Sequence, residues 1–191
     1  LPKNLNEDID LLETKIRAYK QKALSVEELK AFRVPLGIYE QRVSGLYMVR
    51  VRCPGGILSP FRLRAVAQIA KESGSGRLHV TTRQELQLHD IPLDKLIVTL
   101  RKLLEVDLCT KGGGGNTVRN ITASWDSGIS QEEAFDVTPH ALELTSRLAA
   151  LPNSWMLPRK FKIAFSNSPS DNAGAAVNDL GFIAEKRGDL R

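Results

Sequence analysis

The chain of 191 residues has only two cysteines, Cys53 and Cys109, which stand far apart. They form no Cys-x-x-Cys pair, and two thiolates are too few for a structural zinc site or an iron–sulfur cluster, each of which takes about four ligands. Both cysteines lie among apolar, strand-like residues, so we expect them to be buried as small hydrophobic side chains. The sequence therefore predicts no metal centre built by this chain alone.

Long hydrophobic runs are also missing. No stretch reaches the roughly 18 apolar residues of a membrane-spanning helix, and residues 1–10 are polar. We therefore expect neither a membrane span nor a secretory signal, and a protein located in the cytoplasm. The formal net charge is a modest +5. A charge of this size is compatible with an anionic cofactor, a nucleic acid or no charged partner.

What the chain does contain is three short segments, residues 46–53, 78–83 and 85–89, that alternate between apolar and polar side chains. A period of two is the pattern of a β-strand with one buried face. If these strands are neighbours in one sheet, the polar face carries Arg50, Arg52, His79, Arg83, Gln87 and His89, with Glu85 as its one acid. Arginine stays charged and binds carboxylates or phosphates through two parallel hydrogen bonds. The pattern favours a surface for a large, multiply anionic ligand, and the solvated face of an ordinary antiparallel sheet is the alternative.

The order of the predicted elements divides the chain into three parts. Residues 1–36 form a helical arm, with an amphipathic helix over residues 5–20 and a second helix that begins with a Ser25 and Glu28 capping box. We expect this arm to pack on a partner surface. Residues 37–111 follow the order strand, helix, strand, strand, helix, with a last strand near residues 106–110. This order predicts an α+β fold, a ferredoxin-like half-domain with an antiparallel sheet and its helices on one face, followed by part of a second α+β domain.

The helix after the first strand has a clear start and end. Ser59 supplies an N-cap, Pro60 takes the first helical position, and the glycines at 74 and 76 end the helix near residue 73. Residues with the spacing of a buried stripe are Phe61, Val66, Ile69 and Ala70.

Four glycines at residues 112–115 begin the last part of the chain. Glycine permits close backbone approaches, and free N–H groups in such a run can form an anion nest; a flexible linker is the alternative. Residues 157–165 alternate again and place Lys160 and Lys162 on one face. Residues 166–176 are rich in Ser, Asn and Ala, and we expect a loose loop there.

Five ordered motifs together resemble the N-terminal half of the siroheme-dependent sulfite and nitrite reductases, and they cover most of residues 37–183. The motifs are Arg-Val-Arg-Cys-Pro-Gly-Gly at 50–56, Thr-Thr-Arg-Gln at 81–84 with Gln87 and His89, Asn-Thr-Val-Arg-Asn at 116–120, Leu-Pro-Arg-Lys-Phe-Lys at 157–162, and Asn-Asp-Leu-Gly-Phe at 178–182. The resemblance implies that residues 112–191 are the N-terminal, truncated part of the siroheme/[4Fe–4S] domain.

The resemblance also implies roles for residues within these motifs. The cations around the substrate anion on the siroheme iron would be Arg50, Arg119, Lys160 and Lys162. The residues that hold the siroheme carboxylates would be Thr81, Arg83, Gln87 and His89, with Arg52, His79, Asn116 and Arg159 as weaker candidates. Siroheme is a polyanion, so a protein that buries it must supply fixed cations and hydrogen-bond donors.

The implied activity is the six-electron reduction of sulfite to sulfide by a longer enzyme that contains siroheme and a [4Fe–4S] cluster. The cofactors would carry out the redox chemistry, and this chain would supply binding and electrostatics. The cysteine pairs that hold the cluster in this family are missing here. We therefore expect the chain to be inactive alone and to need the C-terminal half of the same enzyme and an electron donor that the sequence does not identify.

Other functions stay open at this point. A nitrite reductase that forms ammonia shares every motif, and a precorrin-oxidising relative shares the scaffold. A module that binds nucleic acid or another anion is an alternative of a different class. Aromatic residues for base stacking are missing from the predicted polar face, since Tyr47 and Phe61 are expected on the core side, and this argues against nucleic acid. A scaffold for assembly is the third alternative.

Overall fold

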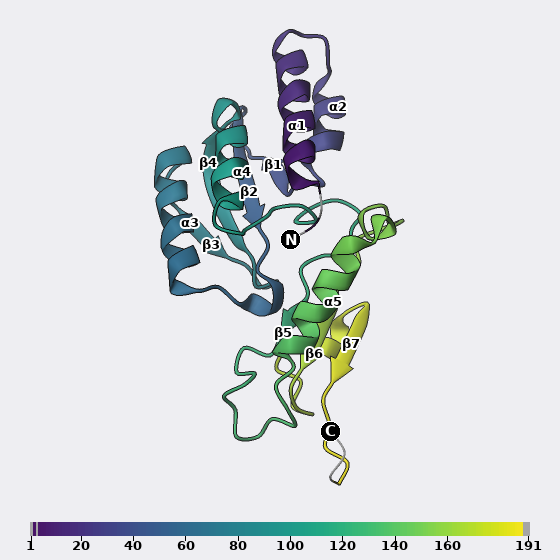
Figure 1. The fold of residues 1–191 in the computed structure, drawn as a ribbon. Helices are drawn as coiled ribbons and strands as arrows, with labels where there is room; N and C mark the ends of the chain where they lie inside the picture. The colour runs from purple at the N-terminus through teal and green to yellow at the C-terminus, as the bar shows by residue number, and fades with distance from the viewer. Residues whose placement is uncertain (1, 3, 189–191) are drawn as a thin grey trace.

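The computed structural model describes residue 2 and residues 4–188 (Figure 1). Residues 1, 3 and 189–191, at the margins of the predicted arm and second domain, lie outside the described residues. Within the described part, two N-terminal helices precede an α+β unit with an antiparallel sheet, and a second unit with a small parallel sheet follows. Short 3-10 turns connect these elements: η1 (Pro54–Gly56), η2 (Leu93–Lys95), η3 (Pro152–Trp155) and η4 (Ala175–Val177).

The first sheet has the strand order β1-β2-β4-β3, and all of its neighbouring strands are antiparallel. Its strands are β1 (Ile38–Glu40), β2 (Leu46–Val51), β3 (Leu78–Val80) and β4 (Leu86–Pro92). Helices α3 (Pro60–Ser73) and α4 (Leu96–Leu104) cover one face (Figure 1). The predicted α+β class, with an antiparallel sheet and helices on one face, is confirmed.

The apolar face of this sheet forms the first core. Val49 and Leu88 are directly opposite on β2 and β4, and both are completely buried against residues of α3 and α4. Helix α3 starts as predicted, since the Ser59 hydroxyl accepts the N–H of Arg62 at 3.2 Å. Phe61, however, is 67% exposed, and its predicted burial is wrong. At 3.6 residues per turn, position 61 lies about 140° around the helix from the buried position 66.

Two of the predicted strands differ from the structure, because one is shorter than predicted and the other is absent from the described residues. Strand β3 stops at Val80, whose side chain is 71% exposed, because the Thr81 hydroxyl accepts the N–H groups of Arg83 and Glu85 and folds residues 81–85 into a turn. Residues 106–110 form a turn and an extended segment instead of a strand. Asp107 has a left-handed φ of 55°, which reverses the chain there.

The N-terminal arm consists of α1 (Leu5–Lys20) and α2 (Val26–Arg33), and the capping box of Ser25 and Glu28 is present. Its apolar side chains, including Ile9 and Leu12, belong to the same core as the first sheet. Arg101 of α4 adds ion pairs to α1. The apolar face of the arm is therefore covered by the chain itself, and the expected docking of the arm on a partner surface stays a prediction.

The second unit contains β5 (Thr122–Ala123), β6 (Ile163–Ser166) and β7 (Leu180–Ile183), which are parallel and adjacent in that order. Helix α5 (Thr138–Ala150) packs on this sheet around Ile121, Ala141 and Ile163. Residues 166–176 are ordered, contrary to expectation. The Asp171 carboxylate accepts the N–H groups of the residues at 175 and 176 at 2.6 and 3.0 Å, so small polar residues stabilise this loop locally.

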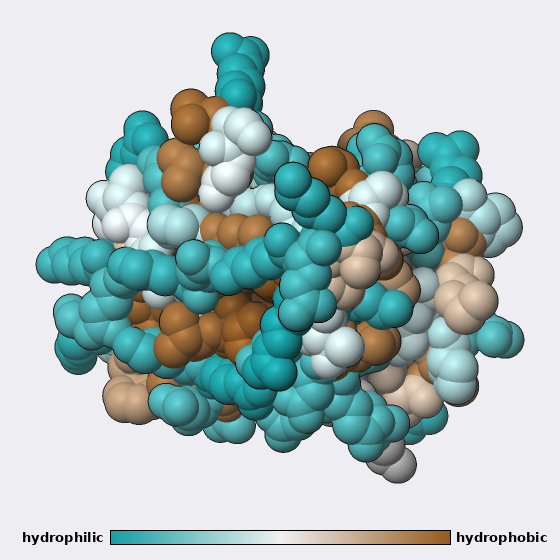
Figure 2. All heavy atoms as spheres, turned by 90° about the horizontal axis from the view of Figure 1, so that it is seen from above, coloured by the Kyte–Doolittle hydropathy of each residue, from teal (hydrophilic) through white to brown (hydrophobic). Residues whose placement is uncertain are grey.

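The surface mixes hydrophilic and hydrophobic side chains. Seen from above, most of the outer atoms are hydrophilic, with hydrophobic side chains visible between them (Figure 2). Among the described residues, no helix combines the length and the apolar character that crossing a bilayer requires.

Candidate active site

A row of polar side chains crosses three strands on the sheet face opposite α3 and α4. Gln87 on β4 is the register partner of both Arg50 on β2 and His79 on β3. With its amide oxygen turned toward Arg50, Gln87 accepts from Nε at 3.2 Å and from Nη2 at 2.8 Å. His89 lies two residues further along β4, and its ring centroid is 6.2 Å from that of His79. Burial lowers the pKa of His89, which favours the neutral imidazole at neutral pH.

The glycine-rich loop joins this face to the second unit. The Gly113 carbonyl oxygen accepts Nη1 of Arg50 at 3.1 Å and Nη2 of Arg119 at 2.6 Å. A Cβ at Gly113 would lie 2.9 Å from the Thr110 carbonyl oxygen, so glycine permits this close approach. The N–H groups of Gly112 and Gly113 donate to Pro35 and Thr110, which removes two donors from the predicted anion nest. The loop is a hydrogen-bonded connection, not a flexible linker.

A parallel bridge brings the segment of Arg119 beside the segment that carries the two lysines. Val118 pairs with Phe161, and the Arg119 N–H donates to the Phe161 carbonyl at 2.9 Å. Val118 and Phe161 contribute to the second core, so we expect alternation to turn Arg119, Lys160 and Lys162 to the opposite side. We call Arg50, Arg119, Lys160 and Lys162 the cationic group.

Arg83 lies apart from the polar row because the turn at 81–85 takes it out of the sheet. Its guanidinium donates Nε to the Asn120 carbonyl at 3.0 Å, Nη1 to Asn178 Oδ1 at 2.6 Å and Nη2 to the Ile163 carbonyl at 2.5 Å. All three nitrogens are therefore bound to the second unit. Its predicted place on the exposed sheet face is wrong.

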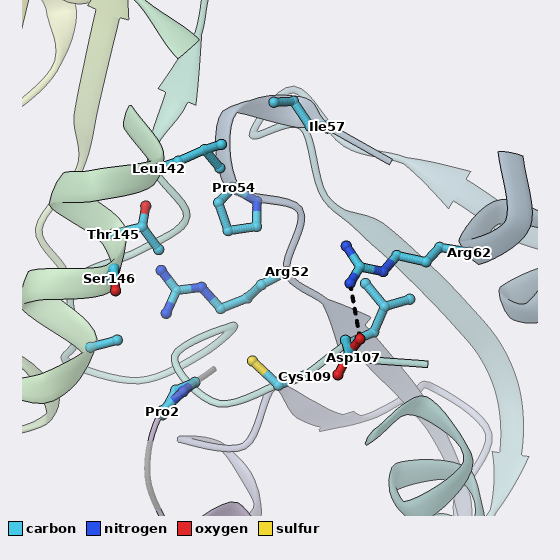
Figure 3. A pocket seen from close by; sticks show the side chains of 12 residues that line it. Pro2, Arg52, Pro54, Ile57, Arg62, Asp107, Cys109, Leu142, Thr145 and Ser146 are labelled. Atoms are coloured by element: carbon cyan, nitrogen blue, oxygen red, sulfur yellow. Dashed lines mark hydrogen bonds and ion pairs between the residues drawn. The ribbon is translucent and has the colours of Figure 1, made fainter. Parts of the chain in front are cut away.

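Arg52 also leaves the predicted face, because β2 ends at Val51 and the alternation ends with it. It is buried, and its two terminal nitrogens donate to the carbonyls of Lys111 and Arg119 at 3.2 and 3.3 Å. Its guanidinium lies at the edge of a cavity of about 460 Å³ between α5 and residues 54–57 (Figure 3). Across this cavity Arg62 is paired with Asp107 at 3.3 Å.

Three further predicted residues shape or flank loops. The Thr81 hydroxyl holds the turn before β4, as described above. The Asn116 side-chain amide donates to the Pro158 carbonyl at 3.2 Å, and the Asn116 main-chain carbonyl accepts the N–H of Leu157. These two bonds fix the start of the segment that carries the lysines. Arg159 is exposed.

Sequence reasoning did not assign a role to Glu85, although it is the one acid on the predicted face. Its side chain is completely buried, and its Oε2 atom lies 3.7 Å from Arg50 Nε. Burial raises the pKa of this carboxyl, while the positive charges of Arg50 and Arg119, and then of Arg52 and Arg83, oppose that effect. A lone acid within an arginine-rich pattern was the signal that could have identified it.

Two family models match the chain. The nitrite/sulfite reductase ferredoxin-like half domain matches residues 39–106, and the nitrite and sulphite reductase 4Fe-4S domain matches residues 114–190. The chain belongs to the nitrite and sulfite reductase family. This family consists of oxidoreductases, and the resemblance inferred from the five motifs is confirmed.

Individual members of the nitrite and sulfite reductase family are similar to this chain. A ferredoxin–nitrite reductase of Leptolyngbya laminosa is 33% identical over 162 residues, which are 81% of this chain and 32% of the relative. A ferredoxin sulfite reductase of Mycobacterium tuberculosis is 34% identical over 137 residues, 72% of this chain and 24% of the relative. The solved Mycobacterium tuberculosis NirA protein has a TM-score of 0.79 and 29% identity, with 92% of this chain and 36% of that chain covered. The chain thus spans about a third of the length of the curated relatives it matches.

The [4Fe–4S] cluster named by the second family model does not fit this chain by itself. Both cysteines are free and buried. Among the described residues, no group of three or more His, Cys, Asp or Glu side chains is placed to hold a metal ion. Because such a cluster takes four cysteine thiolates, a protein that holds one would need ligands from outside these residues.

Proposed function

We propose that this chain supplies the substrate-binding cations and part of the siroheme-binding surface of a sulfite reductase. The observation that supports the proposal is the convergence of Arg50 and Arg119 on the Gly113 carbonyl oxygen, with Lys160 and Lys162 in the segment beside that of Arg119. Four cations from distant parts of the sequence suit a small oxyanion, because each arginine can donate two parallel hydrogen bonds to it.

The polar row has donors that fit the carboxylates of siroheme. His79 is exposed, and Gln87 and His89 lie beside it on the sheet. We assign the carboxylate contacts to these residues, while Thr81, Arg83, Arg52 and Asn116 position the loops around them. Arg159, which is exposed, is a further candidate for a carboxylate.

In the proposed reaction the residues of this chain bind the anion and deliver protons. Siroheme, when bound, supplies the iron and the electron path. Arg50 and Arg119 are held by Gly113, so they can orient sulfite oxygens with little loss of side-chain entropy. The Lys160 and Lys162 ammonium groups can donate protons from Nζ to the oxygens that leave as water.

Nitrite reduction to ammonia is the second candidate function. Ferredoxin–nitrite reductases are among the similar proteins, at 33% and 37% identity. The same four cations suit nitrite, which is also a small oxyanion. The size and charge of the anion would decide whether sulfite or nitrite is preferred. This selection would take place in the complete active site of the full-length enzyme.

The test is the visible absorption spectrum of the full-length protein that contains this chain, purified from a host that makes siroheme. Siroheme bands that shift when sulfite is added are expected. A colourless, folded protein contradicts the proposal. The ratio of kcat/KM for sulfite and nitrite then separates the two candidate functions, because a higher value identifies the preferred anion.

A further inference from the structure

One carboxylate, that of Glu85, lies beside Arg50 of the cationic group. It stands directly before β4 and two positions from Gln87, so both side chains belong to the polar side of the strand. The Glu85 side chain is 0% exposed, and Arg50 Nε is 3.7 Å from its Oε2 atom. Neither carboxylate oxygen has a hydrogen-bond donor in the part of the chain that the structure describes.

Four arginines contribute positive charge at Glu85. Arg50 comes from β2, Arg52 from the segment directly after it, Arg83 from the turn before β4, and Arg119 from the segment after the glycines. The Cys53 thiol is also close, but burial raises its pKa to about 11, so it stays neutral at neutral pH. Among the described residues, Arg50 is therefore the ion-pair partner of Glu85, and the positive charges of Arg119, Arg52 and Arg83 add to its effect.

This arrangement makes the ionisation of Glu85 sensitive to a bound anion. Burial disfavours the charged carboxylate and raises the pKa of Glu85, and the four arginines oppose this effect only in part. An oxyanion that binds Arg50 and Arg119 adds a second negative charge beside the same arginines. Like charges disfavour each other, so the free energy of the pair is lowered if one of them takes up a proton.

We propose that Glu85 is the internal counter-ion of the cationic group and takes up one proton from solvent when an oxyanion binds to Arg50 and Arg119. The carboxylate becomes a neutral carboxylic acid, and no electron is transferred. Glu85 acts through the arginines and is a positioning residue. This inference rests on the proposed anion site. It predicts that the affinity for the anion depends on pH through Glu85, which the four cations alone would not cause.

The test uses the 191-residue chain with sulfate as the probe, since sulfate remains a dianion between about pH 6 and about pH 8. Proton uptake on sulfate addition is measured with an indicator dye in weakly buffered solution. We expect up to one proton per bound sulfate, and an affinity that falls by up to about tenfold per pH unit above the pKa of Glu85. In Glu85→Gln we expect no uptake from this site and an affinity that is less dependent on pH.

Two controls separate Glu85 from other groups. Glu143→Gln removes an exposed glutamate that is paired with Arg147 on α5, and it should keep the full uptake. His79 and His89 remain in Glu85→Gln, so uptake that persists in that variant belongs to the histidines. Infrared difference spectra of the unaltered chain need no variant, because a new carboxylic acid C=O band on sulfate addition reports protonation of a carboxylate directly.

The outcomes are distinct. Sulfate binding with an acid band and with uptake that Glu85→Gln loses supports the inference. Sulfate binding without an acid band overturns it and leaves the proposed anion site intact. No sulfate binding at either pH overturns both the anion site in this chain and the inference that rests on it.

Discussion

The arginine side chains have two different roles in this fold, and their hydrogen-bond partners distinguish the two roles. Arg83 donates all three guanidinium nitrogens to the second unit, and Arg52 donates both terminal nitrogens to main-chain carbonyls. Arg50 and Arg119 instead share the Gly113 carbonyl oxygen, and Arg50 also donates to the Gln87 amide oxygen. Arg52 and Arg83 therefore stabilise the junction between the two units, while Arg50 and Arg119 meet at the loop where we propose the anion site.

The structural role of Arg83 can be measured without any cofactor. Arg83→Ala should lower the free energy of unfolding by about 2 to 3 kcal/mol, because it leaves buried carbonyls unpaired and removes a charge-assisted hydrogen bond. Urea unfolding of the chain measures the change. Arg159→Ala, at an exposed arginine, should change the value by less than about 0.5 kcal/mol. Equal stability of the two variants would show that the Arg83 bonds are dispensable.

Lys160 belongs to the cationic group and is exposed in this chain. In the full-length enzyme, Lys160→Met should retain siroheme and lower kcat by about a hundredfold, because general acids contribute at least about that much. Turnover and the siroheme absorption of the same preparation test this. Lys186→Met, at an exposed lysine of the C-terminal segment, is the matched control. Normal turnover in Lys160→Met would remove this lysine from proton delivery.

At the scale of elements, the glycine-rich loop sets the distance between the arginines. Gly113→Ala places a Cβ 2.9 Å from the Thr110 carbonyl and 3.1 Å from the Arg50 carbonyl, so the loop must move. We expect a loss of about 1 to 3 kcal/mol in stability and weaker sulfate binding, measured by urea unfolding and calorimetry. Gly45→Ala meets nothing within 4 Å and tests a positive φ of 78° alone. The sulfate affinity of Gly45→Ala should be unchanged. If Gly45→Ala weakened sulfate binding as much as Gly113→Ala does, the geometry of the glycine-rich loop would not be what determines the affinity.

The Asp136 carboxylate binds the chain just before helix α5, whose N-cap position is Val137. Its Oδ1 atom accepts the Thr138 N–H and the Ser127 hydroxyl, both at 2.8 Å. Burial alone would raise the pKa of Asp136, but these hydrogen bonds outweigh it and hold the pKa below its usual value. The stabilisation is therefore present above the unfolded-state pKa of about 3.9 and is lost as pH falls through the lower folded-state value.

Asp136→Ala should accordingly lower the free energy of unfolding by about 1 kcal/mol at neutral pH, because it removes two hydrogen bonds to the carboxylate. The difference from the unaltered chain should narrow below about pH 4. Urea unfolding at several pH values measures both. Glu132→Ala, at an exposed acid in the same loop, is the control and should show neither effect. If the difference in stability between Asp136→Ala and the unaltered chain grew as the pH fell, the pKa of Asp136 would not be lowered in the folded state.

The elements that the sequence predicts well are those with local signals. The Ser25 and Ser59 caps and the apolar spacing of α1 and α3 predicted these helices, because capping and periodicity are set by neighbours in the chain. Strand β3 was predicted too long, since the Thr81 hydroxyl bonds end it and alternation cannot reveal them. The exposure of Phe61 was missed for a geometric reason, the angle between positions 61 and 66.

The candidate site was only partly predictable, because it depends on contacts between distant segments. Alternation correctly placed Arg50, Gln87 and His79 on one face. Nothing local indicates that Arg119 meets Arg50 at Gly113, or that Arg83 turns away to the second unit. For these residues the family motifs carried the prediction, and their roles remain proposals.

At the scale of the whole molecule, a small set of polar side chains joins the two units. Asn120 is completely buried, and its amide nitrogen donates to the carbonyls of Cys53 and Arg83 at 2.8 and 3.0 Å. Gln84 adds a two-way contact with Ala123, donating to its carbonyl and accepting its N–H. The cationic group draws on both units, so its geometry depends on this junction.

The junction can be tested because the aromatic residues report on different units. Both tryptophans, Trp125 and Trp155, lie in the second unit, and all three tyrosines lie in the first unit and its helical arm. Tryptophan fluorescence and tyrosine absorbance should therefore follow separate units during urea unfolding. We expect coincident midpoints in the unaltered chain, because the units stabilise each other through buried hydrogen bonds.

Asn120→Ala removes the bonds to Cys53 and Arg83 and leaves their carbonyls unpaired, at a cost of about 1 to 3 kcal/mol. If the junction couples the units, the tryptophan midpoint should fall below the tyrosine midpoint in this variant, since the smaller second core then unfolds first. Asn172→Ala, in an exposed loop of the second unit, should leave both midpoints together. If the two midpoints stayed coincident in Asn120→Ala, packing and not these hydrogen bonds would couple the unfolding of the two units.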